Sequence, residues 1–117
     1  MALSPTDFGG AAAIDGYGPG FFRVAGQVRH GAQIVTAARA ADWGGLDDRA
    51  ALMALAGQVD VLLLGMGAQI AHPPAGLIED LAGAGIMAET MSSPSAARTF
   101  NVLLGEGRRV AAALLPV

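Results

Sequence analysis

An uninterrupted aliphatic strand, followed by a helix and a second strand, is the feature that most constrains the fold of this chain. The strand predicted at 59–64 contains Asp60 near its start and ends in Val-Leu-Leu-Leu, a run with no polar side chain that could face water. A helical pattern of apolar residues follows at 75–84 and stops at Gly85, and a short strand is predicted at 86–89. Strands joined through a helix favour a parallel pair, which buries both faces of the first strand. The sequence therefore predicts an α/β fold.

The C-terminal third contains the best-defined helix. Ser92 or Ser93 can cap its first turn, and Gly105 is predicted to end it. A last strand is predicted at 109–115. The apolar stripe of this helix consists of Ala96, Ala97, Phe100, Leu103 and Leu104. Helices on the two sides of a sheet predict a three-layer domain.

The first half is predicted to be rich in strands. The glycines and proline of residues 16–20 favour a turn between two short apolar strands. The predicted elements of this half are strands at 11–14, 21–24 and 33–36 and a helix at 47–56. With no linker or repeat to divide the chain, we expect a flexible N-terminus at 1–10 and a single domain at 11–117.

Composition excludes several chemistries. All seven cations are arginines, which rules out lysine Schiff bases and Walker-type phosphate loops, and there is no cysteine to form a disulfide, a thiolate nucleophile or a cysteine-type zinc site. Residues 91–117 carry three arginines against one acid, whereas residues 1–90 carry four arginines against nine acids. Three scattered arginines without interleaved aromatics favour a solvated or salt-bridged face, so we predict no nucleic-acid binding.

The chain shows no membrane or secretion signal that we can identify. Residues 1–20 contain no basic residue of the kind that begins a signal peptide, which predicts a cytoplasmic protein. The longest apolar stretch, 59–71, is interrupted by Asp60 and Gln69 and is shorter than the ~20 apolar residues that cross a bilayer. We therefore expect no membrane insertion.

Several short motifs, taken together, resemble the Mth938-like family. The matching pieces are Gly16-Tyr17-Gly18, Phe22-Arg23-Val24, Trp43, residues 62–67, Ala96, residues 98–103 and residues 106–110. This family includes respiratory complex I assembly factor 3 of mitochondria and an adipogenesis-associated protein. The resemblance implies a mixed central sheet with helices packed on it and a small additional β layer. The chain departs from the family pattern at Ser92-Ser93, where an Asp-Thr pair is expected, and at Ala97, where a cysteine is common.

The glycines after the predicted strand at 59–64 also mimic a dinucleotide-binding loop. Gly65 and Gly67 are followed by Glu89 at about the spacing of that motif. The third glycine of the motif is replaced by Ile70, and the prolines at 73 and 74 delay the next helix. We favour the simpler interpretation that the glycines allow a tight exit from the strand, and we predict no cofactor.

No metal or nucleophile site is indicated either. The two histidines, His30 and His72, are not clustered with carboxylates at metal-ligand spacing, so we predict no metal. The hydroxyl residues near the last helix lack a Gly-x-Ser-x-Gly elbow, which makes helix capping the favoured use.

The site hypothesis is an anion-accepting cleft between the loop from Gly65 to His72 and the start of the helix near Ser93. Free helix N–H groups, the positive end of the helix dipole and Arg98 would favour a carboxylate or phosphate there. Its candidate residues are Gly65, Gly67, Ser92, Ser93, Arg98 and Asn101. In the alternative interpretation Arg98 only pairs with Glu89 or Glu106 and orients the fold; Arg108 is a further candidate for such ion pairs.

Two functions remain open at this point. The resemblance implies a non-enzymatic accessory or assembly protein with protein partners, among them respiratory-chain subunits. The alternative is a small enzyme or a metabolite-binding or anion-binding domain that uses the cleft. Four of the six aromatic residues lie between positions 17 and 43, where they either form an exposed interface anchor or, as we favour, pack in the core: Tyr17, Phe21, Phe22 and Trp43. Self-association into a homo-oligomer is also compatible with so small and apolar a domain.

Overall fold

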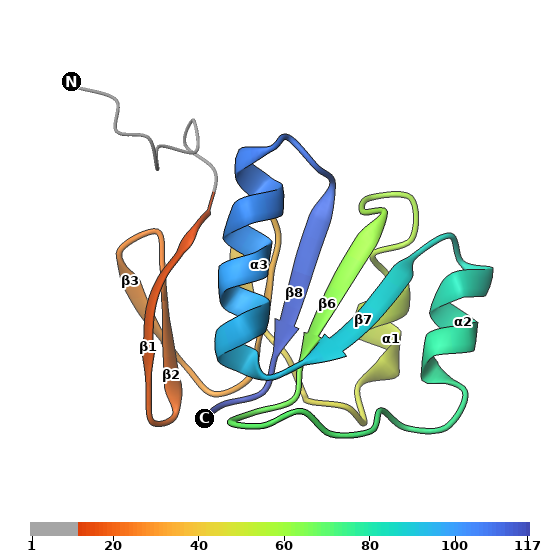
Figure 1. The fold of residues 1–117 in the computed structure, drawn as a ribbon, viewed down its shortest axis with the longest axis horizontal. Coiled ribbons are helices and arrows are strands. Elements are labelled where there is room, and N and C mark those ends of the chain that lie inside the picture. Colours follow the sequence, from red (N-terminus) through yellow and green to blue (C-terminus); the bar gives the residue numbers. More distant parts are fainter. Residues whose placement is uncertain (1–11) are drawn as a thin grey trace.

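The computed structural model describes residues 12–117, which form two sheets and three helices (Figure 1). The smaller sheet is antiparallel in the order β1-β2-β3. Its strands are β1 (Ile14–Gly18), β2 (Phe21–Val24) and β3 (Gln27–His30). The predicted flexible segment 1–10, together with residue 11, lies outside the described residues.

The larger sheet has five strands in the order β5-β4-β8-β6-β7. The strands are β4 (Gln33–Val35), β5 (Ala40–Asp42), β6 (Val61–Gly65), β7 (Met87–Met91) and β8 (Val110–Leu114). The helices are α1 (Arg49–Met53), α2 (Leu77–Gly83) and α3 (Ser93–Gly105). β6 is parallel to β7 and β8, while β4 is antiparallel to β8 and β5. The predicted parallel pair around α2, the mixed sheet and the small additional β layer are therefore confirmed.

The alternation of side chains along β6 and β8 separates two hydrophobic cores. Val61 and Leu63 point to the face covered by α3 and the small sheet, where Phe100 and Phe22 are fully buried. Leu62 and the other residues on the opposite face of these two strands point to α1 and α2. Figure 1 shows α3 on one side of the large sheet, with α1 and α2 on the other and β1 and β2 beside α3. Burial on both faces explains why these strands contain no polar residue, since each fully buried leucine contributes about 1.5–3 kcal/mol.

The first hairpin differs from the predicted one. The sequence predicted a strand at 11–14 and a turn at 16–20, whereas β1 extends through Gly18 and only Pro19 and Gly20 form the turn. A proline followed by a glycine with φ of 77° is the pattern of a type II turn. A Cβ on Gly18 would lie 2.4 Å from the Phe21 ring, so a larger residue at this position would displace that ring from its cross-strand contact. Glycine therefore occurs here for close packing inside the strand as well as for turning.

Two strands were not predicted, and two helices are shorter than predicted, α1 and, by three residues, α2. β3 has a single apolar residue, Val28, which is 52% exposed, and β5 has only three residues, so neither carries a periodic hydrophobic signal. The helix predicted at 47–56 is the short α1, which Asp48 caps by accepting from the Ala51 N–H at 3.3 Å. Such short edge elements are decided by tertiary contacts.

Asn101 joins α3 to the small sheet. Its Oδ1 accepts from the Ile14 N–H at 2.9 Å, and its Nδ2 donates to the Ile14 carbonyl at 2.6 Å. The side-chain amide thus pairs with both backbone polar groups of Ile14 as a neighbouring strand would. Because residue 14 begins β1, this contact sets where the small sheet sits against α3.

We expect Asn101→Leu to lower the free energy of unfolding by about 1–3 kcal/mol, because the N–H and carbonyl of Ile14 lose their partners in a partly buried position. Urea denaturation followed by circular dichroism measures the change. Val102→Ala, at a neighbouring helix position that is 55% exposed, serves as the control and should stay within about 0.5 kcal/mol. Equal stability of the two variants would contradict the assigned role of Asn101.

Candidate functional site

The structure brings Gly65, Gly67 and Ser93 together at the carboxyl end of β6, where the sequence predicted a cleft. Ser93 is fully buried at the start of α3. Its Oγ accepts from the Gly67 N–H at 2.9 Å and donates to the Leu115 carbonyl at 2.6 Å. Its own N–H donates to the Gly67 carbonyl at 2.7 Å. We call these contacts the Ser93 junction, because they join the β6 loop, the start of α3 and the chain after β8.

Close packing explains the glycines of this loop. A Cβ on Gly65 would lie 2.8 Å from the Cα of Ser93 and 2.9 Å from the Leu114 side chain. Gly67 has a φ of 96°, which side chains rarely adopt, and a Cβ there would lie 3.4 Å from the Pro116 carbonyl. Both glycines therefore allow backbone to approach backbone, in agreement with the interpretation of a tight strand exit.

The N–H groups of the first turn of α3 are already used. Ser93 donates to the Gly67 carbonyl, Pro94 has no N–H, Ser95 donates to the Ser92 Oγ at 3.3 Å, and Ala96 donates to the Ser92 carbonyl at 2.9 Å. Ser92 is the N-cap, one of the two serines that the sequence offered for this position. The arrangement does not leave the free donors that the predicted anion cleft required.

Arg98 and Asn101 lie elsewhere, on the flank of α3 that faces β1. They line a small hollow of about 220 Å³ together with Ile14, Asp15, Gly16, Tyr17, Pro94 and Ala97. The Arg98 side chain is exposed and takes part in no ion pair within residues 12–117. The structure thus divides the six candidate residues between the Ser93 junction and this hollow.

The other predicted charged residues are also exposed. Glu89 lies on the edge strand β7, Glu106 is the C-cap of α3, and Arg108 follows in the loop to β8. In the described part of the chain, none of the three forms an ion pair. The ion pairs that do form there were not predicted, and they are Arg23–Asp15, Arg29–Asp42, Arg49–Asp80 and Arg109–Asp60. All lie near the surface, where an ion pair contributes about 0–1 kcal/mol.

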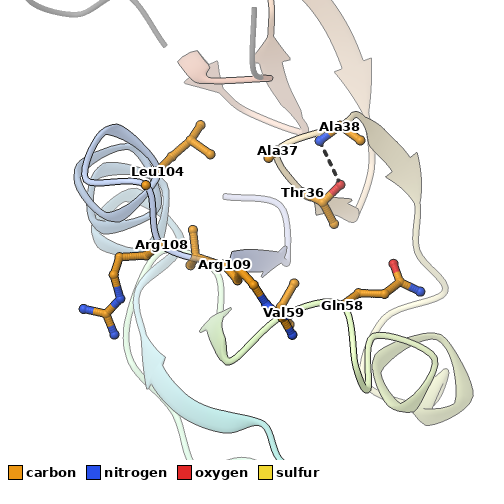
Figure 2. A pocket seen from close by; sticks show the side chains of 10 residues that line it. Thr36, Ala37, Ala38, Gln58, Val59, Leu104, Arg108 and Arg109 are labelled. Carbon is orange, nitrogen blue, oxygen red and sulfur yellow. Dashed lines mark hydrogen bonds between the residues drawn. The ribbon is translucent and has the colours of Figure 1, made fainter. Parts of the chain in front are cut away.

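A larger pocket lies at the opposite end of the sheet, beside the amino ends of β6 and β8 (Figure 2). Its volume is about 480 Å³. Leu104 of α3, together with Val59 and Val110, supplies apolar surface, and the turn at 36–38 forms another wall. Arg109 is held by Asp60 at 3.4 Å and by the Gly57 carbonyl at 3.0 Å, whereas the Arg108 side chain extends away from the pocket in Figure 2.

Sequence reasoning missed this pocket because it placed ligands only at the carboxyl ends of parallel strands. The adjacent Arg108 and Arg109, in a segment with three arginines and one acid, were the one available signal.

The four aromatic residues between positions 17 and 43 do not gather on the surface. Phe22 is fully buried and Trp43 is 5% exposed, as favoured from the sequence. Phe21 packs edge-on against His30, with ring centroids 6.4 Å apart. Tyr17 is the exception at 49% exposed, and it contributes to the hollow beside Arg98.

Solved structures of other proteins share this fold. An outer membrane protein from Bartonella henselae is 38% identical, with a TM-score of 0.82, and the match covers 95% of this chain and 99% of that one. A Mth938-like domain from Bordetella pertussis is 25% identical, with a TM-score of 0.80, over 99% of this chain and 92% of that one. The class of fold is therefore the Mth938-like α/β domain that the sequence motifs predicted.

The chain belongs to the family described as "Protein of unknown function (DUF498/DUF598)", which it matches over residues 14–115. An uncharacterised protein of Rhodobacter capsulatus is 62% identical over 117 residues, covering 100% of this chain and 94% of the relative. NADH dehydrogenase (ubiquinone) 1 alpha subcomplex assembly factor 3 of Danio rerio is 44% identical over 59 residues. That second match covers 50% of this chain and 34% of the assembly factor. Separately, the helices described for this chain are all too short or too polar to cross a bilayer.

We expect Ser93→Ala to lower the free energy of unfolding by about 2–4 kcal/mol, because the Gly67 N–H and the Leu115 carbonyl both lose a buried partner. Ser95→Ala, two residues further along α3, is the matched control and should change stability by less than about 0.5 kcal/mol. Chemical denaturation of both variants measures the difference. A Ser93→Ala protein as stable as the control would contradict the role of the Ser93 junction.

Proposed function

We propose that this protein is a non-enzymatic accessory or assembly protein that binds a protein partner. The observation that carries the proposal is the 44% identity to assembly factor 3 over half of this chain. Because the match covers only 34% of the assembly factor, we do not assign the full activity of that protein to this chain. The relation supports respiratory NADH dehydrogenase subunits as the class of partner. The cytoplasmic site of action is proposed from the sequence alone, because residues 1–20 contain no basic residue.

The buried polar side chains support a binding role over a catalytic one. In the described part of the chain, the buried polar residues are Gln33 and Ser93. Gln33 donates to the His30 carbonyl and to Asp42 and accepts from Arg29, each at 3.0 Å. Ser93 is occupied in the Ser93 junction. Both residues hold the fold together, and the exposed carboxylates are not gathered into a group of three or more that could hold a metal within residues 12–117.

A pull-down of the tagged protein from native extract in mild salt, analysed by mass spectrometry, tests this proposal. We expect reproducible enrichment of respiratory NADH dehydrogenase subunits. We also expect Arg98→Ala to reduce the enrichment, because this exposed arginine has no ionic partner among the described residues and faces the hollow beside β1. Arg108→Ala, which removes another exposed arginine at the opposite end of α3, is the control. A tagged protein that recovers no partner, or only its own copies, would contradict the accessory role.

The pocket of Figure 2 favours a second candidate function, the binding of a small amphipathic anion. Its volume lies within the range of about 300–1,000 Å³ that is typical of ligand sites. Apolar residues from α3 and from the strand ends would contact an aliphatic chain. The exposed Arg108 side chain, which extends away from the pocket in Figure 2, would turn toward the rim to pair with a carboxylate.

We expect octanoate to shift the amide resonances of residues 36–38 and 107–110 in a heteronuclear NMR titration. Arg108→Gln should weaken binding by up to about fivefold, as expected for one exposed ionic contact. Ala38→Trp should abolish binding, because residue 38 is exposed at the pocket wall and the larger side chain would fill the space. Shifts that survive in Ala38→Trp would contradict this candidate.

A further inference from the structure

The edge of the small sheet beside α3 has backbone groups that are available to a further strand. β1 is the outer strand of the order β1-β2-β3. In a hairpin with a two-residue turn, the residues that flank the turn, Gly18 and Phe21, form the hydrogen-bonded pair, so the next pair turns its N–H and carbonyl groups outward. That pair is Tyr17 and Phe22. The Tyr17 backbone therefore points away from β2, and no hydrogen bond to it from outside the small sheet occurs within residues 12–117.

Asn101 shows what this edge accepts. The Asn101 amide pairs with both backbone groups of Ile14, in the manner of one peptide unit of an adjacent strand. Tyr17, the next outward-facing position after the irregularity between Ile14 and Gly16, lacks such a partner in the described part of the chain. An extended chain of another protein, placed along β1 next to the Asn101 side chain, would supply hydrogen-bond partners for the Tyr17 backbone.

The charges beside this edge leave one cation unneutralised. Asp15 is already paired, because one of its carboxylate oxygens contacts Arg23 Nε at 2.8 Å and the other accepts from the Gly26 N–H at 2.8 Å. Arg98 borders the same hollow and has no ionic partner within residues 12–117. The Tyr17 side chain, half exposed, and Pro94 supply apolar surface next to it.

We propose that the free edge of β1 beside α3 binds an extended segment of a partner protein, whose backbone pairs with Tyr17 and whose acidic side chain pairs with Arg98. Alternate side chains of an added strand face the same side, so an acidic and an apolar residue two positions apart would both reach the hollow. The inference rests on the proposed accessory function and specifies the chemistry of its partner.

A defined peptide tests the inference without the natural partner. The probe is an acetylated and amidated hexapeptide, Thr-Glu-Thr-Val-Thr-Thr, titrated into isotope-labelled protein and followed by NMR. We expect saturable shifts at Tyr17, Arg98 and Asn101, slower solvent exchange of the Tyr17 amide, and severalfold weaker binding when glutamine replaces the glutamate of the peptide.

Two variants separate the backbone contact from the ionic one. Arg98→Gln should remove the preference for glutamate over glutamine while the protein stays folded, because Arg98 is exposed. Tyr17→Pro should abolish peptide binding, because it removes the outward N–H without touching the ladder to β2. Arg108→Gln, remote from the hollow, should bind both peptides like the unchanged protein.

Four results would overturn the inference. The first is the absence of saturable shifts at millimolar peptide, and the second is shifts confined to β3, β7 or the pocket of Figure 2. The third is a concentration-dependent dimer, measured by sedimentation, that Tyr17→Pro dissociates, because it would assign the edge to a second copy of this chain.

The fourth result separates the inference from the accessory function. A respiratory partner that binds without slowing exchange of the Tyr17 amide would overturn the inference, yet leave the accessory function standing. Peptide binding at Tyr17 without any partner in the pull-down would leave the inference standing and count against the accessory function.

Discussion

The two-sided burial of β6 and β8 is the constraint on which the rest of the structure depends. These parallel strands have apolar layers on both faces, so every side chain along them must be small or aliphatic, and each face needs its own cover. α1 and α2 cover one face. On the other face α3 alone does not suffice, and the small sheet completes the cover with residues such as Phe22 and Val24.

Polar contacts then set how the covering elements are placed. The Ser93 junction holds the start of α3 against the β6 loop and the chain after β8, while Asn101, two turns further along the helix, holds the first residue of β1. Because hydrogen bonds are directional and costly to leave unmade when buried, these two residues restrict the position of α3 more than its apolar stripe can. The same residues that resembled a binding site in the sequence thus orient layers of the fold.

The surfaces that are available for binding lie away from these polar contacts. The glycines and Ser93 at the carboxyl end of β6 are used in the Ser93 junction, whereas the hollow between β1 and α3 and the pocket at the amino ends of β6 and β8 are open. Both openings combine apolar surface with an exposed arginine of the locally positive C-terminal segment. Because the buried polar side chains are used within the fold, a binding role is expected to use such surface features and edges.

The sequence by itself determined the elements whose signals are local. The aliphatic run at 61–64, the cap at Ser92 and the apolar stripe of α3 predicted the parallel unit and the best-defined helix, because hydrophobic period and capping chemistry depend on nearby residues only. Only the tertiary structure decided that Gly18 lies inside a strand, that three-residue β5 pairs with β4, and that Arg98 faces β1 and not the β6 loop. Those outcomes depend on contacts between residues far apart in the chain, such as the 87-residue separation of Ile14 and Asn101, which no local pattern encodes.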